Sequence, residues 1–143
     1  MRLIQISLFL SFLAISASQS FAQCKSLKTL KTEYAEIIKP YDFEGISAGV
    51  LGAGKTTNIS VSVFSKVKYR FHFYSEGYEG PVIIKIITLN HQVLWTNEKD
   101  PGSMMAEFTP KKTDKYFVEF TTPSSANDDS RGCIAVILSS RPY

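Results

Sequence analysis

The sequence predicts an all-β protein: an eight-stranded, jelly-roll-like β-sandwich with one short N-terminal helix. Two observations support this fold. From Phe43 onward, apolar and polar residues alternate with the period of two that half-buried strands show. Turn residues interrupt the alternation roughly every 8 to 12 residues, the spacing of sandwiches built from short strands. No repeat or linker divides the pattern, so we expect a single domain.

The N-terminal segment has the composition of an export signal. Residues 3–15 form an apolar stretch that is too short to span a bilayer. Ser20 and Ala22 then occupy the small-residue positions of a cleavage site. We therefore expect residues 1–22 to be a signal peptide and residues 23–143 to form a β-sandwich domain that is secreted or periplasmic. No membrane span is expected in the mature chain.

Two cysteines remain after such cleavage, Cys24 and Cys133. An exported chain meets an oxidising environment, where such a pair normally joins. We predict a Cys24–Cys133 disulfide that closes a loop of roughly 110 residues and attaches the N-terminal segment to the last strand. The cysteines are far apart in sequence, which favours a structural bond over a redox-active one.

The predicted elements follow from residue spacing. Leu27, Leu30 and Tyr34 recur at helical spacing before Pro40, which predicts an amphipathic helix over 25–38. The fourth strand is apolar on nearly both faces, as a central strand would be, and should form a hairpin with the fifth. The eight strands are predicted at 43–51, 56–64, 67–74, 82–89, 92–96, 103–108, 115–121 and 133–138.

One motif matches a phosphate-binding loop. Residues 49–56 satisfy G-x-x-x-x-G-K-[ST] without a mismatch. That loop needs a following helix, whereas the residues after Thr56 alternate as a strand. We interpret the segment as a glycine-rich hairpin connection in which Gly52 and Gly54 have positive φ and Lys55 is exposed.

Composition and spacing indicate no cofactor, no metal site and no catalytic residues. The net charge of +3 is too small to indicate nucleic acid binding. His72, on the more polar side of its strand, and His91, in a turn, are both expected to face solvent. Asn127–Ser130 offers oxygen ligands for calcium, although a solvated loop is the preferred interpretation. Asn58–Ser60 matches a glycan acceptor pattern.

The predicted ligand edge is the turn at 74–80. Tyr74, Glu76, Tyr78 and Glu79 lie there, at an end of the sandwich where binding loops usually gather. Tyrosine offers large contact area together with a polar end, which suits a partner protein or a glycan. The only tryptophan, Trp95, is predicted to be a core residue.

Five segments in the C-terminal two thirds of the chain share a pattern with a known group of proteins. They are 69–71, 82–97, 108–110, 114–118 and 132–138. On these segments the chain resembles small exported, uncharacterised bacterial β-sandwich proteins, which are similar to the C-terminal accessory domains of secreted peptidases. The resemblance implies a jelly-roll sandwich and a non-catalytic role, and it supplies no site residues.

These observations favour a secreted, non-catalytic binding or structural module over an enzyme. The expected partner is another secreted or surface protein, or a glycan. The alternative is a small inhibitor or chaperone-like partner of another secreted protein. A minor hydrolase ranks below both, because the sequence contains no pattern of a catalytic triad or metal site.

Overall fold

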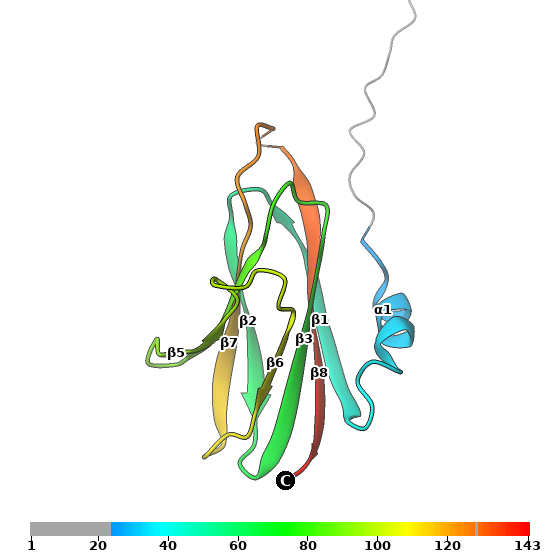
Figure 1. Cartoon of the computed structure of the whole chain (residues 1–143), viewed down its shortest axis with the longest axis vertical. Coiled ribbons are helices and arrows are strands. Elements are labelled where there is room, and N and C mark those ends of the chain that lie inside the picture. Colours follow the sequence, from blue (N-terminus) through cyan, green and yellow to red (C-terminus); the bar gives the residue numbers. More distant parts are fainter. Residues whose placement is uncertain (1–23, 128) are drawn as a thin grey trace, which may run out of the picture.

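The computed structural model describes residues 24–127 and 129–143, so the predicted signal peptide lies outside the described part (Figure 1). All eight predicted strands are present, and the ends of seven of them differ from the expected ends by at most two residues. The last strand differs most, because it continues four residues past Leu138. The elements are α1 (Leu27–Tyr34), β1 (Asp42–Gly52), β2 (Thr56–Val63), β3 (Val67–Glu76), β4 (Ile83–Thr88), β5 (Val93–Thr96), β6 (Met105–Phe108), β7 (Asp114–Thr121) and β8 (Arg131–Pro142).

The strands form two four-stranded sheets that face each other (Figure 1). The order is β1-β8-β3-β6 in one sheet and β2-β7-β4-β5 in the other, and every pair is antiparallel. This order, in which the first and last strands pair and the chain repeatedly changes sheet, is that of a jelly roll. The predicted fold class is therefore confirmed, as is the hairpin of β4 with β5.

The main core fills the space between the sheets. Its largest side chains come from inward-facing positions of β3, β4 and β7, where residues two apart share one face. The Phe73 ring stacks on Trp95 at a centroid distance of 5.2 Å and meets the Phe120 ring edge-on at 6.2 Å. Each fully buried side chain of this size stabilises the fold by about 1.5 to 3 kcal/mol. Trp95 packs against this core, as predicted.

Helix α1 covers the outer face of the first sheet. Its N-terminus is capped by Ser26, whose hydroxyl accepts a hydrogen bond from the Thr29 amide at 3.1 Å. Leu30 and Ile38 are buried against Ala135 and Ile137 of β8, which makes β8 buried on both faces. The helix ends at Tyr34 rather than at residue 38, and turns carry Ile38 to the sheet. The approach of Pro40 disfavours helical geometry in the preceding residue.

The prediction that His72 faces solvent is wrong. The side chain does lie on the outer face of β3, but α1 covers that face and leaves His72 only 9% exposed. The Tyr34 ring meets the imidazole edge-on at 5.7 Å. Among the described residues, no group forms a hydrogen bond with the His72 Nδ1 atom. His91, in the β4–β5 turn, is exposed as predicted.

The buried position of His72 predicts a pH-dependent stability. Desolvation, aided by the nearby Arg70 charge, lowers the pKa of His72 from its ordinary value of 6.5. Below that pH the unfolded chain binds a proton that the folded chain does not, so the free energy of unfolding falls as the pH decreases toward the folded-state pKa. We expect His72→Phe, which keeps a ring against Tyr34, to lack this fall in urea unfolding experiments across the pH range.

Glu107 also makes stability depend on pH, but in a lower pH range than His72. An ion pair with Lys68 is the chief cause that lowers the pKa of Glu107 from 4.5 to about 2. Stability linked to Glu107 is therefore present above pH 4.5 and is lost only as the pH falls from there toward about 2. Parallel wild-type and His72→Phe profiles between about pH 6.5 and 5 would contradict the assignment to His72.

The segment that matches a phosphate-binding loop connects the two sheets. It is not a hairpin, because β1 and β2 belong to different sheets. Of the two glycines predicted to have positive φ, Gly54 does, at 65°, and Gly52 does not, so the prediction for Gly52 is wrong. Lys55 is exposed, and strand β2 follows it in place of a helix. The amides of residues 53–55 all donate to protein oxygens in the β7–β8 connection.

No helix within the described ranges is long and apolar enough to cross a membrane.

Candidate functional site

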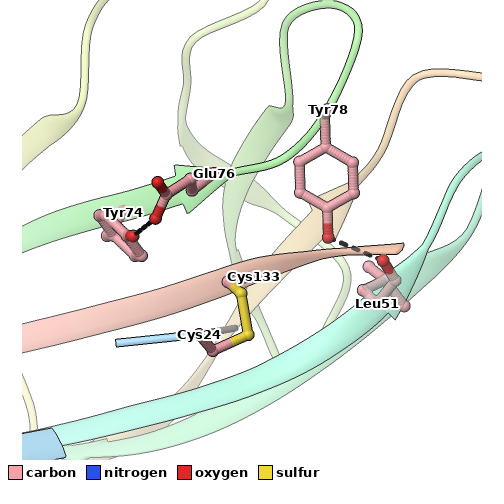
Figure 2. The surroundings of a disulfide bond; sticks show 6 residues. All are labelled: Cys24, Leu51, Tyr74, Glu76, Tyr78 and Cys133. Atoms are coloured by element: carbon pink, nitrogen blue, oxygen red, sulfur yellow. Dashed lines mark hydrogen bonds between the residues drawn. A yellow bond between two sulfur atoms is a disulfide. The ribbon is translucent and has the colours of Figure 1, made fainter. Parts of the chain in front are cut away.

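The predicted disulfide joins Cys24 to Cys133 across a Cα–Cα distance of 5.5 Å. Cys133 lies on β8 in register with Val50 of β1 and Glu76 of β3. The bond therefore fixes the residues just before α1 to β8, an inner strand of the first sheet, as Figure 2 shows.

A cavity of about 280 Å³ lies beside this bond, between the start of α1 and the outer surface of β1, β8 and β3. Most of its lining is apolar. Leu27 and Val50 line it and remain 54% and 57% exposed, so the apolar surface continues outside the cavity. Exposed apolar surface next to a concavity is the usual composition of a binding site. Lining side chains include Cys24, Leu27, Leu30, Val50, Tyr74 and Cys133.

One of the four predicted ligand-binding residues lines this cavity, and a second is hydrogen-bonded to it. Tyr74 lines it, and its hydroxyl donates a hydrogen bond to the Glu76 carboxylate two residues along β3 (Figure 2). Burial, and then the hydrogen bond to Glu76, raise the pKa of Tyr74, so the hydroxyl remains a donor. The Lys25 ammonium lies 5.4 Å from the centre of the Tyr74 ring and also pairs with Glu33 at 2.9 Å.

The other two predicted residues lie further along the turn and have different surroundings. Tyr78 is half-buried against the core, and its hydroxyl donates to the Leu51 carbonyl at 2.8 Å. Gly77, with φ of 90°, redirects the chain between Glu76 and Tyr78. Glu79 accepts a hydrogen bond from the Ser125 hydroxyl at 3.1 Å. Tyr78 therefore positions the turn, and ligand binding by these four residues stays a prediction.

Thr122 is a structural residue that the sequence did not single out. It is buried at the start of the β7–β8 connection, and its hydroxyl donates to the Gly52 carbonyl at 2.7 Å and accepts from the Lys55 amide at 3.0 Å. The Gly54 amide also donates to the Pro123 carbonyl at 2.9 Å. Together with the bonds of Tyr78 and Glu79, these contacts connect three loops at one end of the sandwich. No local pattern marks a threonine for this role, because its partners are distant in sequence.

The loop at 127–130 is described except for Asp128. The Asn127 side chain accepts a hydrogen bond from the Asp129 amide at 3.1 Å. In the described part of the chain, no three histidine, cysteine or acidic side chains are gathered as metal ligands. Calcium binding by this loop stays an untested alternative, as does glycosylation at Asn58.

No protein-family model matches the sequence, and no curated protein matches it. A solved structure does match. The fold is similar to that of Aeromonas hydrophila PliG, a periplasmic lysozyme inhibitor of g-type lysozyme. The alignment covers 72% of this chain and 90% of PliG, with a TM-score of 0.52 and 11% sequence identity.

At this identity the match establishes a shared fold. The predicted resemblance to accessory domains of secreted peptidases is not tested by it and stays a hypothesis.

Proposed function

We propose that the protein is an exported, non-catalytic inhibitor that binds another exported protein. The observation that carries the proposal is the similarity of nearly the whole PliG inhibitor fold to this domain. The disulfide is consistent with an oxidising compartment outside the cytoplasm. This similarity supports the inhibitor interpretation more than a structural module or a glycan-binding domain.

The proposed binding surface is the end of β3 together with the adjacent cavity. Tyr74 and Glu76 offer an aromatic face and a carboxylate next to an apolar concavity that could accept a partner side chain. Interface energy is usually concentrated in such aromatic anchors beside pockets. Glu79 extends the acidic surface along the same turn.

The loops around this surface are held in place before any partner binds. Thr122 and Tyr78 connect the three neighbouring loops by hydrogen bonds to backbone groups, and the disulfide fixes the segment before α1. An inhibitor gains affinity when its contact surface needs little ordering on binding, because less conformational entropy is lost. This end of the sandwich meets that requirement.

A direct test measures inhibition of lysozymes. The mature protein is titrated against a g-type lysozyme, and lysis of cell-wall suspensions is followed by turbidity, while calorimetry reports binding and stoichiometry. A c-type lysozyme serves as the specificity comparison. We expect saturable inhibition of the g-type enzyme with a defined stoichiometry. Absence of both binding and inhibition for the g-type and the c-type enzyme would overturn lysozyme as the target class.

Substitution of Tyr74 tests the surface. We expect Tyr74→Ala to weaken enzyme binding by about 1 to 3 kcal/mol, since it removes an aromatic anchor. Tyr74→Phe, which keeps the ring and loses the bond to Glu76, should have a smaller effect. The matched control is Tyr143→Ala. This tyrosine is 86% exposed, and its amide bonds to Lys66 before β3, at the opposite end of the sandwich. Equal affinity of Tyr74→Ala and wild type, with unchanged melting temperatures, would place the binding surface elsewhere.

A further inference from the structure

The four sheet edges differ in length in a way that singles out one side of the sandwich. On one side, the edge strands β5 and β6 have four residues each, and such short edges are a common protection against unwanted pairing. On the other side lie β1, with 11 residues, and β2, with 8. Within the described chain, β1 pairs only with β8 and β2 only with β7.

The long edge of β1 is accessible and nearly free of charge. Residues 47–50 are all exposed, and added side-chain atoms at Gly45 or Gly49 would meet nothing within 4 Å. Its only charged residues are Asp42 and Glu44, at one end. Lysines, prolines and inward-pointing charges that normally prevent edge pairing do not occur in the central part of β1.

The charges at the two ends of β1 are complementary under two-fold symmetry. Asp42 and Glu44 lie at the start of the strand. Lys55 follows its end, and Arg131 of β8 is paired with Gly52 there. If β1 pairs antiparallel with an identical strand, Asp42 and Glu44 of each copy lie near Lys55 and Arg131 of the other. Opposite charges across a strand pair are favourable, whereas like charges are not.

We propose that β1 is a dimer interface at which two copies of this chain join their sheets, with Ala48 of one copy opposite Ala48 of the other. In this register, Val50, which is largely exposed in one copy, lies across from Ile46 of the second copy on the same outer face. A second copy fits better than an unrelated strand because each copy supplies the same unpaired edge and the matching charges, so the contact closes on itself. The dimer proposal goes beyond the proposed inhibitor function but shares residues with it, because Ala48, Gly49 and Val50 also line the cavity beside the disulfide.

The first test is oligomeric state. Analytical ultracentrifugation of the mature protein over about a hundredfold range of concentration should show a reversible monomer–dimer equilibrium. Ala48→Lys places two ammonium groups opposite each other on the axis and should raise the dimer dissociation constant about tenfold or more. Gly49→Lys, at a position with open space around it, gives a second disruptive variant that should still fold. Ser60→Lys on the β2 edge is the matched control and should leave dimerisation unchanged.

A charge exchange tests the predicted orientation. Asp42→Lys and Lys55→Asp should each weaken the dimer by about threefold or more, and the two substitutions together should restore it. Hydrogen exchange of β1 amides should be slower in the wild type than in Ala48→Lys at equal concentration. A wild-type monomer at every concentration would overturn the proposal. A dimer that resists Ala48→Lys but is lost in Ser60→Lys would overturn it in favour of the β2 edge.

Discussion

Removal of the Cys24–Cys133 disulfide is expected to lower the free energy of unfolding by about 4 to 5 kcal/mol. The bond closes a segment with a sequence separation of 109 residues, so it restricts most of the unfolded domain. The test compares wild type with a Cys24→Ala/Cys133→Ala variant in urea unfolding. Alanine is preferred to serine because Cys133 is buried, and a hydroxyl there would add a desolvation cost of its own.

Two further readouts identify the origin of this loss. The unfolded variant should be more expanded, so its unfolding should depend more steeply on urea concentration. Release of the segment before α1 should also loosen the helix, which covers His72, and raise hydrogen exchange in residues 27–38. Wild-type protein whose disulfide is reduced without mutation is the control. A loss below about 1 kcal/mol in both reduced and substituted protein would mean that the disulfide does not stabilise the fold.

The strands could be predicted because their signal is local. In β3, Tyr69, Phe71 and Phe73 alternate with polar residues, and this alternation alone places the three aromatic rings on one face. The disulfide could be predicted from the number of cysteines and the export signal. The jelly-roll-like sandwich could be predicted from the count and spacing of the strands, since few architectures accommodate eight short antiparallel strands.

The environment of the opposite face of β3 could not be predicted in the same way. Alternation separates side chains into two sets but does not say what covers each set. His72 was expected in solvent because its neighbours on that face are polar, yet α1, attached through the disulfide to β8, packs over it. The length of α1 was likewise overestimated, because Ile38 reaches the sheet through turns rather than through a continued helix.

In the candidate site, too, local spacing predicts contacts between neighbouring residues but not contacts with distant ones. Tyr74 and Glu76 are two residues apart on a strand, so their meeting on one face follows from strand geometry. The change of direction at Gly77 separates Tyr78 from them and places its ring against Gly132 of β8. That contact joins residues more than fifty positions apart, and no spacing within 74–80 indicates it.

Replacement of Gly132 by alanine is therefore expected to cause a large destabilisation, about 3 kcal/mol or more. A Cβ atom at this position would lie 2.6 Å from the Tyr78 Cζ atom and closer still to the Glu76 carbonyl oxygen. Side-chain rotation cannot relieve the second contact, because that oxygen belongs to the backbone of β3, the strand that pairs with β8. Either the two strands separate locally or the turn after Glu76 moves.

The matched control is Gly49→Ala on β1, where an added Cβ meets nothing within 4 Å. It should leave the free energy of unfolding within about 0.5 kcal/mol or raise it slightly, because glycine is unfavourable in a strand. A double variant, Gly132→Ala/Tyr78→Ala, distinguishes the two contacts. It removes the clash with the ring but not the clash with the Glu76 carbonyl, so we expect it to be at least as unstable as Gly132→Ala alone. Recovery of stability in the double variant would mean that the ring, and not the close approach of the β3 and β8 backbones, requires glycine at this position.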